Sequence, residues 1–285
     1  MTRVTAIGLL TGWGAGAAAL PEDARAAAAG RRVIPVARPA YDGERFRRAT
    51  RECLLGVAAV DAMLADAGLD REAIRGSDTA LLYATAAAYG ASNRSFIVGS
   101  TEARTTGGLA QTPRGSVGAA GGSVYFPYTA PSAVPAEVAI EYGLRGGYVI
   151  LVGGATAGIE ALWQAATLLS TGRCRRAVVL AVETFAECEM LWARGRWTVR
   201  APLVEAAACA LLDGAGDVSY ALAGVPAPLE TLAGRRAGET LACGPLIALA
   251  LAREAGEAQP RVTGQWRGHR MGVTLELATA AARTA

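Results

Sequence analysis

Residues 148–183 read YVILVGGATAGIEALWQAATLLSTGRCRRAVVLAVE, and this stretch decides the fold. It opens with five apolar residues that favour a strand, and helix-forming residues follow over 158–171 as far as Gly172. An apolar run over 177–182, followed by Glu183, predicts a second strand over 177–183. Because the stretch also contains several glycines and Glu160, we expect a buried strand that runs into a buried helix and not a membrane span.

Apolar strands and helices alternate outward from this stretch in both directions. The clearest further helix covers 47–68, where apolar residues recur every three or four positions and Gly68 ends the pattern. Other strands are expected at 4–10, 79–85, 205–212, 218–223 and 272–277, and other helices at 18–31, 93–101, 131–142 and 241–254. The alternation predicts an α/β fold in which helices cover both faces of a sheet.

Charge and cysteine content exclude several classes of function. The 285 residues include 28 arginines, no lysine and 25 carboxylates, and the net charge of +3 is dispersed along the chain. This pattern is typical of a solvated mixed surface, so we expect no nucleic-acid partner. An odd number of cysteines without a CxxC pair indicates reduced thiols in a cytoplasmic protein and no zinc site. The five are Cys53, Cys174, Cys188, Cys209 and Cys243.

Neither a cofactor nor a membrane segment is expected. His269 is the only histidine, which excludes chemistry built on histidine pairs. Gly12, Gly14 and Gly16 are spaced somewhat like a dinucleotide-binding loop, but the third glycine comes too early and no acidic residue follows at the required distance. Residues 1–16 are typical of a buried first strand and lack a signal-peptide cleavage site.

The quoted stretch resembles the nucleophile segment of β-ketoacyl synthases, in which a strand turns sharply into a buried helix. In that family a cysteine nucleophile lies at the elbow, and counting back from Gly172 places Ala155 there. Further segments are similar to the family in the same order and cover nearly the whole chain. They are RVTAIGLLTGWGAG (3–16), RATRECLLGVAAVDAMLADAGLD (48–70), YFPYTAPSAVPAEVAIEYGLRGG (125–147), LVEAAACALLD (203–213), GETLACGPLIALALAREAG (238–256) and WRGHRMGVTLEL (266–277).

This resemblance implies a thiolase-like layered α-β-α fold with a truncated second half. Residues 1–223 would form the ketosynthase-like N-terminal half, and 224–285 the trimmed remnant of the C-terminal half, packed in the same domain. No linker separates independent domains, although the composition changes character over 224–238.

Several catalytic groups of that family have no counterpart here. Ala155 carries no nucleophile, and Glu239 stands where the second histidine is expected. The segment that would bring the first histidine is reduced to 224–236, and Gly234 or Arg235 takes the place of a lysine. A carboxylate at position 239 would repel a developing enolate. The resemblance therefore implies no catalytic residue and no condensing activity of the chain on its own.

Chain length factors of type II polyketide systems resemble ketosynthases, lack the nucleophile and pair with an active ketosynthase. GGATAGIEAL (153–162) is similar to their corresponding stretch, although Ala155 replaces the glutamine that is usual there. The resemblance implies a non-catalytic subunit that binds an active ketosynthase and an acyl carrier protein in polyketide or fatty-acid-like biosynthesis and shapes the acyl pocket. Two alternatives stay open: a small enzyme that reuses the pocket for hydrolysis, cyclisation or acyl transfer, and a carrier-protein-binding scaffold.

Three further residues, Glu205, Cys243 and His269, are expected near the remnant of the acyl pocket. We expect Glu205 to keep a structural hydrogen-bonding role and Cys243 to be a small buried hydrophobe. His269 stands between arginines in a glycine-rich turn, which favours a structural or surface role. Glu239 fits the simpler role of a first-turn carboxylate favoured by the helix dipole. Residual chemistry at Cys243, His269 or Glu239 stays open.

Parts of the surface are candidates for partner contacts. The apolar strand Tyr148–Val152 resembles the edge through which the family dimerises, which implies a hetero- or homodimer. Arginine clusters at 31–32, 173–176 and 235–236 would suit the phosphate or acidic surface of a carrier protein, although solvated surface charge is the simpler interpretation. Residues 105–123, rich in glycine, serine and threonine, are expected to form a mobile or partner-contacting loop.

Overall fold

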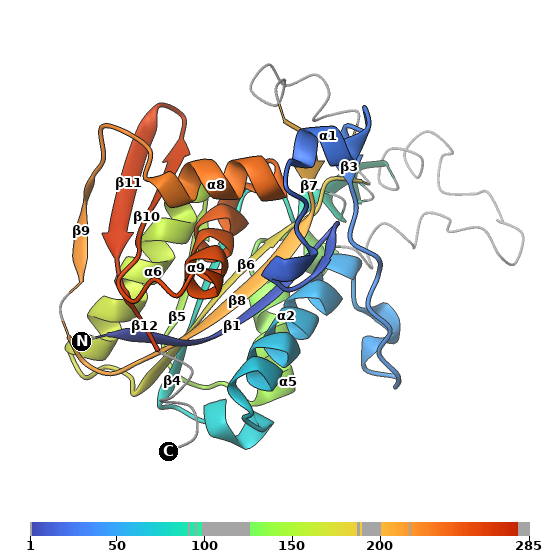
Figure 1. Ribbon diagram of the computed structural model, residues 1–285. Coiled ribbons are helices and arrows are strands. Elements are labelled where there is room, and N and C mark those ends of the chain that lie inside the picture. Colours follow the sequence, from blue (N-terminus) through green and yellow to red (C-terminus); the bar gives the residue numbers. More distant parts are fainter. Residues whose placement is uncertain are drawn as a thin grey trace, which may run out of the picture.

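A computed structural model of the chain describes residues 2–90, 92–94, 96–98, 126–186, 189, 201–216 and 218–278. The strands of its main sheet are β1 (Arg3–Thr11), β2 (Gly14–Ala15), β4 (Thr79–Thr85), β5 (Tyr148–Val152), β6 (Arg176–Glu183), β8 (Ala206–Asp213) and β12 (Glu276–Leu277). Their order is β12-β1-β8-β6-β4-β5, with β2 paired to β1 (Figure 1). β8 is antiparallel to its neighbours β1 and β6, whereas β6, β4 and β5 are parallel.

Helices cover both faces of this sheet. One face carries α2 (Arg51–Ala67) and α5 (Ala133–Tyr142), and the other carries α6 (Ala155–Ser170) and α9 (Gly244–Glu254) (Figure 1). On the first face, α2 packs directly against the backbone of β1 at Gly8, where a Cβ would lie 2.3 Å from the carbonyl oxygen of Ala59 in α2. Only glycine permits this approach.

A second, three-stranded sheet packs on the far side of α6. It consists of β10 (Arg261–Trp266), β11 (His269–Thr274) and β9 (Ser219–Leu222), in the order β10-β11-β9. One aromatic contact joins this sheet to the helix: the Trp163 ring of α6 stacks on the Tyr220 ring of β9, with ring centroids 4.4 Å apart. Helix α8 (Pro228–Ala237) packs against α9 and β10. The expected helix-sheet-helix layering is thus extended by a small fourth layer.

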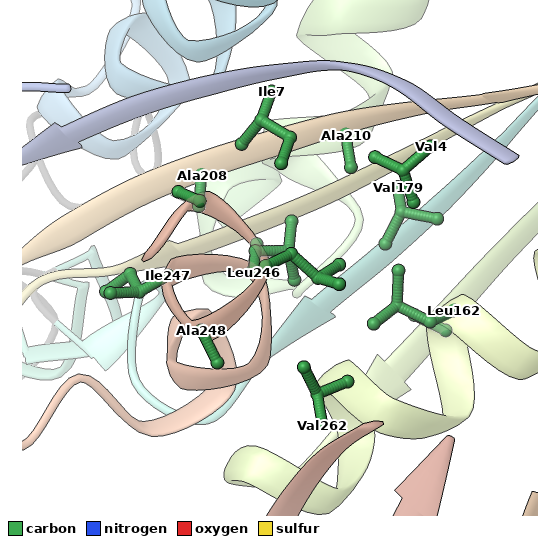
Figure 2. Close-up of a cluster of buried hydrophobic side chains, with 14 of the residues drawn as sticks. Val4, Ile7, Leu162, Val179, Ala208, Ala210, Leu246, Ile247, Ala248 and Val262 are labelled. Atoms are coloured by element: carbon green, nitrogen blue, oxygen red, sulfur yellow. The ribbon is translucent and has the colours of Figure 1, made fainter. Parts of the chain in front are cut away.

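The main hydrophobic core lies between the large sheet, α6 and α9. Figure 2 shows Leu162 of α6 and Leu246 of α9 directed toward Val179 of β6, with Val262 of β10 closing the cluster from the second sheet. These side chains are fully or almost fully buried. Burial of apolar area on this scale is the dominant stabilising contribution to the fold.

Short elements complete the described chain. They are the helix α1 (Ala24–Ala28), the paired strands β3 (Val33–Ile34) and β7 (Leu203–Val204), and the 3-10 turns η1 (Ala17–Ala19), η2 (Phe46–Arg48), η3 (Arg71–Ile74), η4 (Phe126–Thr129) and η7 (Leu241–Cys243). The structure confirms the predicted α/β class. Helix α6 begins at Ala155 and not at residue 158, since the helix starts directly after the glycine pair. Helix α8 and strand β10 were not predicted.

The structure bears on the expectations for the cysteines and for membrane-spanning segments. Cys53, Cys174, Cys209 and Cys243 are buried free thiols, and Cys188 lies outside the described residues, as does the expected loop 105–123. Within the described ranges, every helix is too short or too polar to cross a membrane. The same ranges contain no group of histidine, cysteine and carboxylate side chains arranged to hold a metal ion.

Candidate functional site

The elbow consists of Gly153, Gly154 and Ala155, between the end of β5 and the start of α6. Strand β10 and the hairpin turn after it lie on this elbow. A Cβ on Gly154 would be 2.2 Å from the Trp266 ring, and one on Gly264 would be 2.8 Å from the Ala155 Cβ. Glycine at 154 and 264 is therefore what lets the second sheet reach the elbow.

A cavity of about 600 Å³ opens beside the elbow. Ala155 and Glu239 both line it, so the structure brings these two sequence-predicted residues together. Its further walls are Glu230, Ala233, Gly234, Gly238, Thr240, Leu241, Gly244, Pro245, Thr263, Gly264, Gln265, Trp266, Arg267 and Gly268. The described lining thus contains no cysteine, serine, histidine or lysine, and the Ala155 methyl group cannot attack a thioester or carry an acyl chain.

Glu239 lies just before η7, close to the elbow. The approach is tight because Gly158 of α6 faces η7: a Cβ there would be 2.4 Å from the carbonyl oxygen of Ala242. Glu239 Oε1 accepts the backbone N–H of Leu241 at 3.0 Å. Burial raises the pKa of the Glu239 carboxyl, and the negative charge of Glu230 raises it further. The surroundings of Glu239 therefore disfavour the charged form of its carboxyl group.

Glu183, at the end of β6, is a functional-site neighbour that sequence reasoning missed. Its carboxylate is fully buried and accepts backbone N–H groups of Ala86 at 2.7 Å, Ala87 at 2.8 Å and Ala242 at 3.2 Å. Through these hydrogen bonds the Glu183 carboxylate links the loop after β4 to η7. Burial raises its pKa to about 8 against the opposing effect of these donors. The only signal in the sequence is a carboxylate that ends a wholly apolar strand.

Glu205 is buried beside β7 and pairs with Arg51 of α2. Arg51 Nη1 and Nη2 lie 2.5 and 2.8 Å from the two carboxylate oxygens. The carboxylate also accepts the N–H groups of Val36, Phe185 and Ala186 at 2.7 to 2.8 Å. Burial alone would raise the pKa of Glu205, but the Arg51 hydrogen bonds and charge outweigh it and the pKa is lowered.

Cys243 and His269, like Glu205, are absent from the described lining of the cavity. The Cys243 thiol is buried, 3.5 Å from the Ala206 carbonyl oxygen, and burial raises its pKa well above the ordinary value. A thiol in this setting stays protonated and is a poor nucleophile. His269 is exposed at the start of β11, opposite Trp266 in the ladder. The structure therefore does not assemble these residues with Ala155 and Glu239.

The sequence of this chain matches the model of a known protein family. The model of the β-ketoacyl synthase N-terminal domain matches residues 35–203, more than half of the chain. The chain belongs to the β-ketoacyl synthase family. The match spans α2, β4, β5, α6 and β6, and so includes the elbow on which the resemblance rested. No curated protein sequence matches this family member.

Solved structures of ketosynthases share the fold. A chain of the ishigamide ketosynthase/chain length factor is 16% identical, with a TM-score of 0.67 over 97% of this chain and 99% of that one. A type II polyketide synthase acyl carrier protein complex with its ketosynthase bound to the hexaketide gives 12% identity and a TM-score of 0.70, over 97% and 99%. A ketosynthase in complex with its chain length factor, from Xenorhabdus doucetiae, gives 13% and 0.59, over 96% and 99%. At these low identities, the comparison shows that this chain shares the thiolase-like fold of these ketosynthase structures.

Proposed function

We propose that the chain is a non-catalytic ketosynthase-like subunit that pairs with an active ketosynthase in polyketide or fatty-acid-like biosynthesis and shapes its acyl pocket. One observation carries the proposal: the first residue of α6, at the elbow where the family's nucleophile is expected, is Ala155. A family member without a nucleophile has no group to accept the acyl chain from a thioester. We infer that such a chain binds a subunit that has one.

The environment of the elbow supports a loss of condensing activity. Condensation needs donors that stabilise negative charge on an enolate. The described lining of the cavity offers Glu239 where the resemblance places a histidine, and a carboxylate destabilises an enolate. Restoring a thiol at one position would therefore leave the site without its electrophilic groups.

The exposed edge of the main sheet supports association. β5 is the last strand of the sheet order and pairs only with β4 among the described strands. Its ends carry Tyr148 and Val152, whose exposures are 46% and 57%. An edge strand with unpaired backbone groups and exposed apolar side chains suits a second strand from a partner. We propose this edge as the ketosynthase contact, in a heterodimer or, without that partner, a homodimer.

The acyl carrier protein is proposed to meet the exposed arginines. Arg236 is not available for this contact, because it donates to the carbonyl oxygen of Leu20 at 2.8 Å and lies 3.6 Å from the Glu254 carboxylate. Arg173 and Arg175 are exposed on the turn between α6 and β6. They are the better candidates for a phosphate or an acidic carrier surface.

The division of the chain at residue 223 and the cytoplasmic location remain part of this proposal. Residues 224–285 are proposed to be the trimmed C-terminal half, within the same domain as 1–223. The packing of α9 against α6 and the main sheet in one hydrophobic core supports a single domain. Buried free thiols support a reducing compartment.

The test is co-expression with candidate ketosynthases from the source genome, followed by size-exclusion chromatography with mass analysis. A stable complex of the two chains is expected, and Val152→Arg should abolish it. Leu222→Arg, at a 74% exposed apolar position on the second sheet, is the matched control and should leave the complex intact. Two separate chains in the native sample, or condensation of acyl and malonyl carrier proteins by this chain alone, would overturn the proposal.

The cavity favours one alternative, a small enzyme that reuses the pocket for hydrolysis, cyclisation or acyl transfer. Glu239 is the titratable group best placed for it, since it lines the cavity with a raised pKa. If product output in the co-expressed system falls with Glu239→Gln but the two-chain complex forms normally, the enzyme interpretation is favoured.

A further inference from the structure

The charges around the cavity are unevenly paired. Glu230 of α8 is hydrogen-bonded to Thr263 and pairs with Arg270, whose Nε lies 3.1 Å from Glu230 Oε2. Arg267 holds its guanidinium 5.6 Å from the centre of the Trp266 ring. Glu239 has no arginine within 4.0 Å in the described part of the chain. Among the described lining groups, Glu239 and Arg267 each form no ion pair within 4.0 Å, and Glu239 is the carboxylate of the two.

We propose that the cavity binds a small organic ammonium compound whose charge is met by the Glu239 carboxylate. Glu239 is partly buried, and a partly desolvated carboxylate is stabilised by an opposite charge at hydrogen-bonding distance. A bound ligand can supply that charge where the protein does not. This site goes beyond the proposed subunit function, because it lies within one chain and needs no partner.

The size and walls of the cavity suit such a ligand. Its volume of about 600 Å³ lies within the range of roughly 300–1,000 Å³ that is usual for small-molecule sites. Ala155, Leu241, Pro245 and Trp266 provide apolar wall, so the ligand needs an aliphatic or aromatic body attached to its ammonium group. A few charged and polar groups among apolar walls form the pattern that orients a small molecule.

The backbone holds Glu239 in place at an energetic cost. Leu241, whose N–H binds Glu239 Oε1, has a φ of +47°, in the left-handed region that residues with side chains rarely adopt. Backbone strain of this kind persists where the surrounding structure imposes it, and it clusters at ligand-binding sites. The strained residue, its bond to the carboxylate and the cavity wall coincide at one position.

Several charged groups act on Glu239 from the elements packed around it. They are Glu230 with its partner Arg270, Glu183 at the end of β6, and Arg267 on the hairpin. The negative charge of Glu230 reinforces the attraction of a cation, whereas Glu183, whose pKa is raised to about 8, is largely protonated below that pH. Arg267 opposes it, but its side chain lies over the Trp266 ring. The balance favours an ammonium group over a carboxylate ligand.

The experiment compares three probes of one length on the isolated full chain at pH 8: n-hexylammonium, hexan-1-ol and hexanoate. Binding measured by titration calorimetry or ligand-detected NMR should be at least about tenfold tighter for hexylammonium than for either other probe. Equal or tighter binding of hexanol or hexanoate would overturn the proposal, because the cavity would then recognise the alkyl body or an acyl-like anion.

Variants locate the site. Glu239→Gln should weaken hexylammonium binding about tenfold or more, whereas the exposed control Glu257→Gln should not change it. Gly234→Leu is a second variant that keeps the test valid if position 239 is needed for folding. Gly234 lines the cavity, and a Cβ there would meet nothing within 4 Å, so leucine should fill space without disturbing the fold and should also weaken binding. Unchanged binding in both variants would refute the site, whatever the outcome of the ketosynthase experiment.

Discussion

The Trp266 ring lies directly on the backbone of Gly154, so that a Cβ on this glycine would be 2.2 Å from the indole. This contact couples the second sheet to the elbow. We expect Gly154→Ala to lower the free energy of unfolding by about 1–3 kcal/mol, because the ring or the elbow must move. Urea denaturation measures the change.

The double variant Gly154→Ala/Trp266→Ala tests the cause of that loss. Removal of the ring removes the clash, so the two substitutions should be strongly non-additive. Gly224→Ala is the control, since a Cβ at this position meets nothing within 4 Å. Additive effects, or an equal loss at Gly224, would contradict the steric explanation.

The pair of Arg51 and Glu205 predicts a large stability effect from one substitution. Glu205 is fully buried, and Arg51→Met would leave its charge without a cation, at a cost of about 3–5 kcal/mol. Arg75→Met, which breaks the exposed pair with Glu72, should cost at most about 1 kcal/mol. Comparable losses in the two variants, measured by urea denaturation at pH 7, would show that the buried pair is not special.

The same pair also predicts the acid side of the stability curve. Because the folded pKa of Glu205 is lowered, its contribution is present above the unfolded pKa near 4.5 and is lost as the pH falls through the folded value. Thermal unfolding below pH 4.5 should therefore show a steep loss of stability. Arg51→Met should make this loss shallower.

Glu183 predicts the opposite dependence at higher pH. Its folded pKa of about 8 lies above the ordinary 4.5, so the folded chain keeps a proton that the unfolded chain has released between these values. The free energy of unfolding should then fall as the pH rises from 4.5 to 8 and level off above 8. Glu183→Gln should flatten this slope in melting curves taken from pH 5 to 9. A slope that survives in Glu183→Gln would assign it to other groups.

Ala155→Cys tests whether a nucleophile alone would restore the family's chemistry. We expect no condensation product from acyl and malonyl carrier proteins, because the described cavity offers a carboxylate at 239 and no donor of positive character apart from Arg267. Mass spectrometry of the carrier-bound products makes the measurement, with an active ketosynthase as the positive control. Turnover by Ala155→Cys would mean that the elbow residue was the one missing group.

Local pattern was sufficient to predict the elements that surround the elbow. The apolar period and the glycines that end the helices located α2 and α5 to within a few residues. The same pattern placed the start of α6 at residue 158, three residues late, and only the family resemblance put Ala155 at the elbow. Helix α8 was missed because its charged residues and Gly234 dilute its apolar face, and β10 was missed because Gly264 and Gln265 interrupt its pattern.

The arrangement of the site depends on contacts between distant residues, which no local pattern reports. Trp266 and Gly154 are 112 positions apart, yet their packing shapes the cavity. Glu183 reads as the polar end of an apolar strand, and only the fold shows that Ala242 donates to it. Sequence proximity to the expected pocket likewise could not distinguish Glu239, which lines the cavity, from Cys243, four residues later, which does not.

The open edge at β5 also bears on how such a chain must be produced in a cell. On its outer side β5 pairs with no described strand, so its backbone groups beside exposed Tyr148 and Val152 can pair with a strand from another chain, including another copy. Copies made in excess of a partner are then exposed to aggregation and proteolysis, whereas copies that find one are protected by mass action. If the proposed ketosynthase partner covers this edge, the soluble yield of the chain should follow the dosage of that partner and not the chain's own rate of synthesis.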